Sequence, residues 1–230
     1  MLKMQNLSKV YRTELIETHA LRDFHLEVKQ GEFVAVTGPS GSGKTTFLTI
    51  AGLLESPNGG LYELDGQDVS RLGDDARSRL RNEKIGFIFQ AFNLIPDLSV
   101  LDNIEVPLRY RGMKADERRR RATQALERVG LESRGRHLPG QLSGGQQQRV
   151  AIARALAGSP RFLLADEPTG NLDTHMARAV MELLEELHRE GTTLIMVTHD
   201  PQQAARAQRH VQVIDGQVID GATLQREVLA

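Results

Sequence analysis

Gly38 to Thr45 read G-P-S-G-S-G-K-T, which matches the pattern G-x-x-x-x-G-K-[ST] at every fixed position. The residues before this stretch, F-V-A-V at 33–36, are apolar and predict a short buried strand. The residues after it, T-F-L-T-I-A at 46–51, are compatible with a helix. Strand, glycine-rich turn and helix N-terminus form the context in which this pattern binds phosphate.

The predicted chemistry of this loop comes from its backbone. Gly41 and Gly43 lack a Cβ atom, so the loop is able to wind tightly and point successive N–H groups at one anion. The following helix adds the positive end of its dipole, equivalent to about half an elementary charge. We therefore interpret the stretch as a nucleoside triphosphate site rather than a fortuitous glycine- and serine-rich loop. Lys44 is expected to reach the β- and γ-phosphates, and the Thr45 hydroxyl to ligate Mg²⁺. The expected phosphate-binding residues are Gly38, Pro39, Ser40, Gly41, Ser42, Gly43, Lys44, Thr45 and Thr46.

Length and composition limit the number of domains and the classes of function that the chain could have. A chain of 230 residues suits one large domain or two intimate ones, and 40% apolar with 26% charged residues is ordinary for a soluble globular protein. The net charge of −1 gives no reason to expect nucleic acid as a partner. The absence of cysteine excludes disulfides, thiolate catalysis and cysteine metal sites. With neither a signal peptide nor a membrane span expected, any membrane role would come through a partner.

Strand-like and helix-like segments alternate along the chain, which predicts an α/β fold with a mainly parallel sheet. Alternating apolar residues indicate a half-buried strand from Phe24 to Lys29, and Asp65-Gly66 indicates a hairpin turn after a strand at 61–64. Further strands are predicted at 85–89, 162–165, 193–197, 211–214 and 217–219, and helices at 74–82, 100–111, 115–129, within 140–156 and at 174–190. We interpret 91–155 as a helical insertion within one domain, whose α/β core comprises 1–90 and 156–230.

A run of four arginines, Arg118 to Arg121, follows Glu117 on one predicted helix. Such a run invites a nucleic-acid or acidic-lipid hypothesis. Because the whole chain is nearly neutral, we favour a solvated helix face.

Polar residues end three of the predicted strands, and ligands of open parallel sheets bind at the carboxyl ends of strands. Asp166 is in the position expected of a carboxylate that holds Mg²⁺, and Glu167 could then face the attacking water. The alternative is an acidic pair in a surface loop. His199 could donate to the γ-phosphate, and the amide of Gln90 suits a metal or a water. Each of these two signals is weak by itself, and their convergence favours a hydrolytic site.

A second glycine-rich turn, L-S-G-G-Q at 142–146, also precedes a predicted helix and has the character of an anion site. One triphosphate needs only one such cradle. The economical explanation is that this turn covers the nucleotide of a second copy, so that two chains enclose two ATP molecules head to tail.

The turn and the Q-Q-R that follows it resemble the signature of ATP-binding-cassette (ABC) ATPases, and the resemblance extends over essentially the whole chain. It implies a P-loop NTPase of RecA-like type, with an N-terminal antiparallel β subdomain and an inserted α-helical subdomain that carries the signature. The signature residues implied to bind the opposite copy's nucleotide are Ser143, Gly144, Gly145 and Gln146, of which Ser143 and Gly145 would reach the γ-phosphate.

Four other residues match family positions. Tyr11 resembles the aromatic residue that stacks on adenine, although a strand tyrosine packing on the core is the alternative. Gln90 resembles the glutamine that contacts Mg²⁺ or water and senses the transmembrane partner. Asp173 resembles the aspartate of the D-loop, and His199 resembles the switch histidine.

Segments around Gln90 and at 103–108 resemble the lipoprotein-release and macrolide-exporter group. The resemblance implies a Mg²⁺-dependent ATPase that works as a homodimer on the cytoplasmic face of the inner membrane. Its partner would be a permease with a large extracytoplasmic domain, contacted through Leu94–Leu108. The same chemistry could instead drive signalling or cell-envelope remodelling. A soluble ABC ATPase and a non-hydrolysing ATP-gated module are less favoured, the second because Glu167 and His199 are present.

Overall fold

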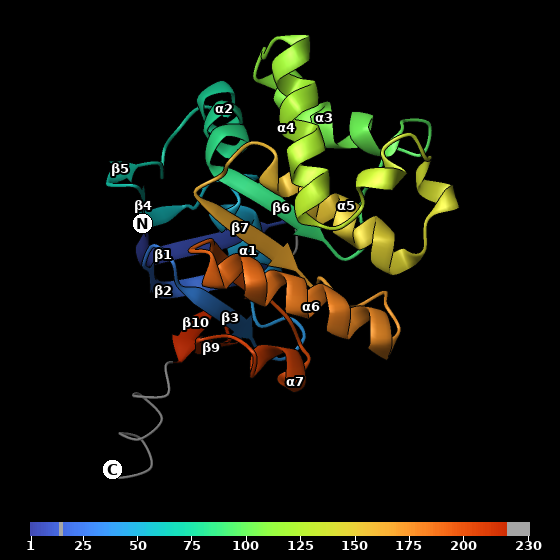
Figure 1. The fold of residues 1–230 in the computed structure, drawn as a ribbon. Coiled ribbons are helices and arrows are strands. Elements are labelled where there is room, and N and C mark those ends of the chain that lie inside the picture. Colours follow the sequence, from blue (N-terminus) through green and yellow to red (C-terminus); the bar gives the residue numbers. More distant parts are fainter. Residues whose placement is uncertain (14–15, 220–230) are drawn as a thin grey trace. The chain divides into compact units, whose positions relative to one another are not determined.

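The computed structural model describes residues 1–13 and 16–219. The described residues form two compact units. Their helices and strands are labelled in Figure 1. The first comprises the described residues of 1–78 and of 195–219, and the second comprises Arg79–Leu194. The boundaries fall within two elements, α2 (Asp74–Lys84) and β8 (Thr193–Val197).

An antiparallel sheet in the first unit has the strand order β2-β1-β4-β5. Its strands are β1 (Leu2–Arg12), β2 (Glu17–Val28), β4 (Gly59–Leu64) and β5 (Gln67–Asp68). Alternate residues of β2 are buried from Phe24 to Val28, as expected of a strand with one face on the core. The predicted strands at 24–29 and 61–64 are thus confirmed, and β1 and the first half of β2 are additions.

A second set of strands in this unit has the order β10-β9-β3-β8. β3 (Phe33–Thr37) pairs in parallel with β9 (Arg209–Ile214), and β10 (Gln217–Ile219) pairs antiparallel with β9. Every residue of β3 and β8 is buried, which explains why both read as continuous apolar runs. The helices of this unit are α1 (Lys44–Ala51) and the short α7 (Pro201–Ala204).

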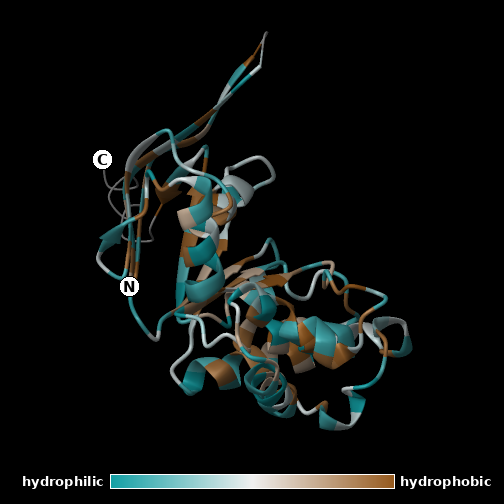
Figure 2. Cartoon of the chain, turned by 90° about the horizontal axis from the view of Figure 1, so that it is seen from above, coloured by the Kyte–Doolittle hydropathy of each residue, from teal (hydrophilic) through white to brown (hydrophobic). Residues whose placement is uncertain are grey.

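The second unit packs helices against a parallel pair of strands, β6 (Ile85–Phe89) and β7 (Phe162–Asp166). The helices are α3 (Val100–Tyr110), α4 (Ala115–Arg128), α5 (Gly144–Leu156) and α6 (Thr174–Arg189), with 3₁₀ turns at Glu132–Arg134 and Pro139–Gln141. α5 contacts α3, α4, α6 and β6, and its buried residues are mostly small or aliphatic. Hydrophobic strands and inner helix faces contrast with hydrophilic outer faces in Figure 2.

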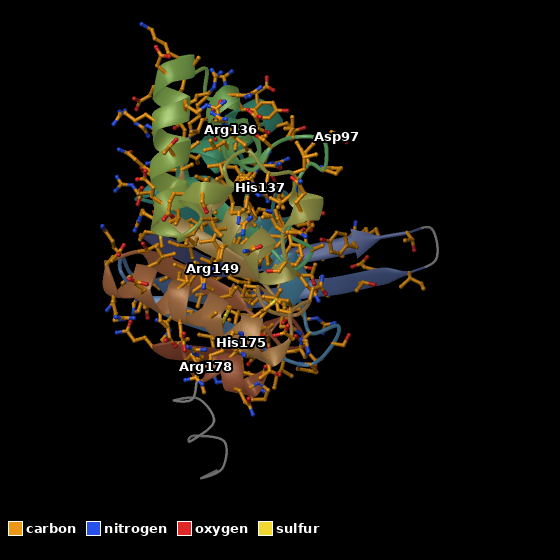
Figure 3. All side chains as sticks on the ribbon, turned by 45° about the vertical axis from the view of Figure 1, so that its right-hand side comes forward. Asp97, Arg136, His137, Arg149, His175 and Arg178 are labelled. Carbon is orange, nitrogen blue, oxygen red and sulfur yellow. The ribbon has the colours of Figure 1, made fainter. Side chains whose placement is uncertain are left out.

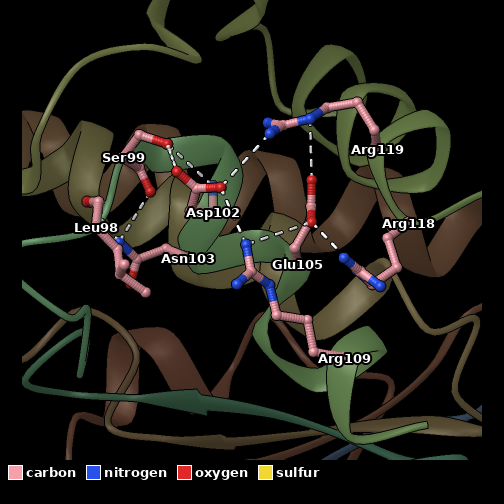
Figure 4. Close-up of polar contacts among 8 residues, drawn as sticks. All are labelled: Leu98, Ser99, Asp102, Asn103, Glu105, Arg109, Arg118 and Arg119. Atoms are coloured by element: carbon pink, nitrogen blue, oxygen red, sulfur yellow. Dashed lines mark hydrogen bonds and ion pairs between the residues drawn. The ribbon is translucent and has the colours of Figure 1, made fainter. Parts of the chain in front are cut away.

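Ion pairs join α3 to the arginine run of α4 (Figure 4). The Glu105 carboxylate, whose side chain is 4% exposed, lies 3.0 Å from Arg119 Nε, 3.3 Å from Arg118 Nε and 3.6 Å from Arg109. Arg120 and Arg121 pair instead with Glu117 of their own helix. The run is therefore engaged in ion pairs within the unit, and only part of it forms the expected solvated face.

No helix in residues 1–13 and 16–219 has both the length and the apolar character needed to cross a membrane.

Candidate functional site

The phosphate loop follows β3 and ends at the first residue of α1. Gly43 is the N-cap of α1 and supplies no side-chain hydrogen bond, and no acidic residue lies in the first turn. The first N–H groups of a helix lack partners within the helix, and a side-chain cap or an anion normally satisfies them. The loop therefore has the local structure of an anion site.

Two glycines of the loop are required by close backbone approaches. Gly43 has φ +105°, and a Cβ atom there would lie 2.5 Å from the carbonyl oxygen of Ala20 in β2. A Cβ atom on Gly38 would lie 2.1 Å from the carbonyl oxygen of Val213 in β9. Gly41, at φ +78°, has open space where a Cβ would be. The loop thus fits against strands from both ends of the chain.

The polar side chains of the phosphate loop differ in burial and in hydrogen bonding. Lys44 Nζ donates to the carbonyl oxygens of Gly38 at 2.7 Å and of Pro39 at 2.8 Å, so the ammonium folds back over the loop. Ser42 is 3% exposed, and its Oγ has no hydrogen-bond partner among the described residues. A buried hydroxyl without a partner is unusual in a folded protein and fits a loop built to take a polar ligand. Thr45 is exposed and Thr46 is half-buried in the first turn of α1.

Tyr11 lies near the end of β1 and is 39% exposed, so it does not pack into the core. Its hydroxyl donates to Glu55 Oε2 at 2.6 Å, and Lys9 Nζ lies 5.2 Å from its ring centroid. Burial and the bond to Glu55 raise the pKa of the Tyr11 phenol, against a smaller opposing effect of Thr46. The ring is thus exposed near Thr46 of α1, and the adenine contact stays a prediction.

His199 follows β8 in the first unit. The backbone N–H of its neighbour Thr198 donates to the carbonyl oxygen of Val36 at 3.1 Å. This bond joins the end of β8 to the strand that leads into the phosphate loop. The first unit thus brings together three predicted features: the loop, Tyr11 and the strand end that carries His199.

Gln90 directly follows β6 in the second unit and contacts the loop that follows β7. Its Nε2 donates to Asn171 Oδ1 at 3.2 Å, and Asn171 Nδ2 donates to the backbone carbonyl of Gln90 at 3.1 Å. A Cβ atom on Gly170 would lie 2.6 Å from Gln90 Nε2. The glycine therefore makes room for this glutamine.

Asp166 is the last residue of β7 and is half-buried, and Glu167 follows it. Burial, and then the charge of Glu167, raise the pKa of the Asp166 carboxyl above its usual range. Glu167 has φ +45°, a left-handed conformation that is costly for a residue with a Cβ atom. Asp166 thus ends the strand and Glu167 begins the turn after it, and the division of roles between the two carboxylates stays a prediction.

The second glycine-rich turn forms the start of α5. Ser143 is its N-cap: Ser143 Oγ accepts from the N–H of Gln146 at 3.3 Å, and Gln146 Oε1 accepts from the N–H of Ser143 at 3.0 Å. This reciprocal capping box satisfies two N–H groups. The N–H of Gly145 donates to the thioether of Met176 at 3.3 Å, and a Cβ on Gly144 would lie 3.3 Å from Leu172. The turn thus packs on the start of α6.

Asp173 is the N-cap of α6, where its Oδ1 accepts from the N–H of Met176 at 2.8 Å. The predicted D-loop residue therefore has a structural bond, and the same first turn contacts the signature through Met176. The second unit brings together Gln90, the acidic pair, the signature turn and Asp173 around the ends of β6 and β7.

Gln148, the second glutamine of the Q-Q-R run, is a residue to which the sequence analysis gave no role of its own. It is completely buried, and its Nε2 donates to the carbonyl oxygen of Pro168 at 2.6 Å and to that of Phe89 at 3.3 Å. A polar residue on the same helix face as Ile152 and Ala155 was the available signal, because a buried amide needs specific partners.

The loop before α3 is held by one buried side chain. Asn103 is fully buried, and its Oδ1 accepts from the N–H of Ile95 at 2.7 Å. Its Nδ2 donates to the carbonyl of Ile95 at 3.0 Å. It also donates to the carbonyls of Leu98 and Ser99 at 3.0 Å each, and these three residues are drawn in Figure 4. The loop exposes Ile95 by 43% and also exposes Asp97.

A neighbouring hollow of about 500 Å³ extends this surface. The N–H of Val100 donates to the carbonyl of His137 at 2.8 Å, which holds the segment after α4 beside the start of α3. Asp97, Arg136 and His137 lie on the same side of the second unit in Figure 3. The hollow is lined by Ser99, Leu101, Asp102, Arg119, Gly135 and Arg136. The lining is therefore mainly polar and charged, with Leu101 as its apolar side chain.

Comparisons with known proteins show which family the chain belongs to. A family model described as ABC transporter matches residues 21–170. Over 219 residues the chain is 51% identical to the uncharacterized ABC transporter ATP-binding protein YvrO of Bacillus subtilis, covering 95% of this chain and 96% of that protein. It is 49% identical to the macrolide export ATP-binding/permease protein MacB 1/2 of Paracoccus denitrificans, covering 95% of this chain and 33% of that longer protein.

Among solved structures, the ATP-binding cassette MJ0796, a dimer in a post-hydrolysis state bound to ADP and Pi, matches with a TM-score of 0.85 at 45% identity. The match covers 95% of this chain and 96% of that chain. The fold class predicted from the sequence, a P-loop α/β cassette with an antiparallel sheet and added helices, is thereby confirmed. The chain belongs to the ABC transporter family and is an ATP-binding, ATP-hydrolysing cassette of that family.

Proposed function

We propose that this ATPase powers a membrane permease through ATP-driven closure of two copies of the chain. The observation that carries the proposal is the presence of two glycine-rich helix N-termini, at α1 and α5, in one cassette. One copy's phosphate loop would hold a triphosphate that the other copy's Ser143, Gly144, Gly145 and Gln146 cover. Dimeric solved relatives support this arrangement.

Binding begins at the phosphate loop. The N–H groups from Gly41 to Thr46 surround the phosphates, and Lys44 exchanges its contacts with the carbonyls of Gly38 and Pro39 for phosphate oxygens. Ser42 and Ser40 supply hydroxyl donors, and Tyr11 stacks on the adenine ring. Asp173 of the second copy adds a D-loop contact.

The Mg²⁺ of the bound nucleotide would be held by Thr45, Gln90 and Asp166. Hydroxyl, amide and carboxylate oxygens are ligands that Mg²⁺ accepts together with phosphate oxygens. The half-buried Asp166 carboxyl, whose pKa burial raises, is suited to a divalent cation that neutralises its charge. Within the described residues no group of three His, Cys, Asp or Glu side chains forms a metal cluster, and a nucleotide-bound Mg²⁺ needs none. When bound, the metal would neutralise developing charge on the phosphates.

Hydrolysis requires a water placed in line with the γ-phosphate. Glu167 accepts a hydrogen bond from this water and polarises it, and the water oxygen forms a bond to phosphorus as the bond to ADP breaks. His199 holds the γ-phosphate in position, and Lys44 and the partner copy's Ser143 neutralise its charge. ADP and phosphate are the products.

The permease contact is proposed within Leu94–Leu108. Val100, Ile104 and Leu108 of this segment are buried against the unit's own helices, so the contact is assigned to residues 94–98 and the adjoining hollow. Likeness to MacB supports export from the inner membrane, with the cassette on the cytoplasmic face. The cargo class would be lipoprotein, peptide or macrolide-like.

Replacing Glu167 with Gln tests the chemistry. The variant is expected to bind ATP normally, to hydrolyse it at least about 100-fold more slowly and to accumulate as an ATP-bound dimer. Glu182→Gln, which loses an exposed ion pair with Arg178, is the matched control. Hydrolysis at the normal rate by Glu167→Gln would show that the assigned base is wrong.

A photocrosslinker at Ile95 tests the partner. It is expected to capture an integral-membrane protein, whereas the same group at Arg178 on the exposed side of α6 should not. Capture that is equal at both positions would remove the proposed contact.

A further inference from the structure

We propose that Gln148 is a positioning residue for ATP hydrolysis, which fixes the backbone at Pro168, the residue after Glu167, relative to the signature helix. The proposal rests on the role of Glu167 given above. It concerns one buried carboxamide that links three parts of the second unit: α5, the end of β6 and the turn after β7.

The carboxamide contacts two backbone carbonyls. Nε2 of Gln148 donates to Pro168 O at 2.6 Å and to Phe89 O at 3.3 Å. Because both neighbours are acceptors, only the NH₂ end of the amide is able to face them. Oε1 has no hydrogen-bond partner among the described residues, so these two donor bonds set the orientation of the side chain.

Each carbonyl belongs to a residue next to a proposed site residue. Pro168 follows Glu167, which has φ +45°, so a neighbouring bond helps to hold this strained turn. Phe89 precedes Gln90. The Gln148 amide therefore restrains the backbone beside two residues: Glu167, the proposed base, and Gln90, a proposed metal contact.

The helix that carries Gln148 is itself closely held. A Cβ atom on Gly86 of β6 would lie 2.6 Å from the carbonyl oxygen of Ala155 in α5. Arg154 of α5 donates to the carbonyls of Phe92, at 2.8 Å, and Asn93. α5 starts at the signature serine, so a displacement of the signature would be transmitted through a rigid helix to Pro168 O.

Gln148→Met tests this inference, because methionine has a similar volume and no donor. The variant is expected to bind ATP with normal affinity and to show a kcat about 100-fold lower with little change in KM, since small misplacements of a catalytic group have effects of this size. Gln124→Met, at an exposed glutamine of α4 in the same unit, is the control for this type of substitution and should retain the wild-type kcat.

Two further variants exclude a purely structural effect. Ile152→Val, a fully buried change in α5, reports what lower stability alone does to kcat. Gln148→Met combined with Glu167→Gln should still form ATP-bound dimers, because the signature turn does not depend on this amide. Loss of dimerisation, or a parallel loss of ATP affinity and kcat in Gln148→Met, would overturn the proposal.

Different results would disprove the role of Glu167 and the role of Gln148. If Glu167→Gln hydrolyses ATP normally, the proposed function is wrong. If Glu167→Gln is inactive while Gln148→Met retains the wild-type kcat, only the positioning role is wrong.

Discussion

Asn171 and Gln90 hold each other through two hydrogen bonds, one in each direction, at 3.2 and 3.1 Å. The pair joins the residue after β6 to the loop between β7 and α6. Asn171→Leu is expected to release the Gln90 side chain and to lower kcat about tenfold with little change in KM, because an orienting contact acts on the transition state. Asn171→Asp keeps the acceptor and loses the donor, so its kcat should be intermediate. Steady-state ATPase assays measure both, and an unchanged kcat in Asn171→Leu would show that Gln90 is oriented without it.

Gly43 and Gly41 provide a matched pair of substitutions in the phosphate loop. Gly43→Ala places a Cβ atom 2.5 Å from Ala20 O, whereas Gly41→Ala enters open space and has only a strained φ. We expect Gly43→Ala to abolish ATP binding. Gly41→Ala should lose about 1 kcal/mol of stability and bind ATP more weakly. Titration with a fluorescent ATP analogue measures the difference, and equal affinities would contradict the close approach.

Tyr62 of β4 is bonded to the C-terminal end of α1, the helix that follows the phosphate loop. Its ring is buried, and its hydroxyl donates to the carbonyl oxygen of Ala51, the last residue of α1, at 2.8 Å. Tyr62→Phe is expected to lower the free energy of unfolding by about 1 kcal/mol and to leave kcat unchanged. Tyr110→Phe, at a side chain 83% exposed, should change neither. Because burial raises the pKa of Tyr62, the effect should be the same throughout the neutral pH range.

Glu105 is the buried centre of the α3–α4 ion network. Glu105→Gln leaves three arginines without their shared carboxylate, and we expect a loss of about 2 kcal/mol, less than for a fully buried pair because Arg109 and Arg119 are half exposed. Urea unfolding measures this loss. Asp102→Asn removes a more exposed member of the network and should have a smaller effect. An equal loss in both variants would show that burial of Glu105 is unimportant.

The raised pKa of Asp166 predicts a pH dependence of stability. A carboxyl with a higher pKa in the folded state keeps its proton where the unfolded chain releases it. The free energy of unfolding of nucleotide-free protein should therefore fall as pH rises from the usual aspartate pKa through the raised one.

Asp166→Asn removes this effect. The variant should match the wild type at the low end of that window and exceed its stability by about 0.5 to 2 kcal/mol at neutral pH, as often happens when a functional charge is removed. Unfolding in urea across the pH range provides the comparison. Wild-type stability that rises relative to Asp166→Asn with pH would contradict the assigned direction.

Some elements could be predicted because local pattern alone determines them. β8 consists of five buried residues, and the polar residues Thr198 and His199 follow it. The predicted strand at 193–197 has the same bounds. β1 was missed because its pairing with β2 shifts register between Met4 and Leu7 and again before Val10. Such irregularities interrupt the alternation from which a strand is recognised.

The site shows the same division. Fixed spacing predicted the phosphate loop, where Gly38, Gly41 and Gly43 have positive φ, and resemblance to a family motif located the signature turn. Gln148 could not be assigned because its partners are carbonyls 59 and 20 residues away, and any residue supplies a carbonyl. The engagement of the α4 arginines was missed for a related reason, because Glu105 belongs to another helix.

Asn103 makes four hydrogen bonds to the loop before α3, so the chain itself holds the backbone of the proposed permease contact, residues 94–98. A preformed surface loses little conformational entropy on binding, and selectivity then depends on side chains rather than on loop folding. Specificity could therefore diverge by point substitutions at Ile95, Asp97 or Arg136 without altering the backbone. A cassette of this kind could be redirected to another permease while its ATPase machinery stayed the same.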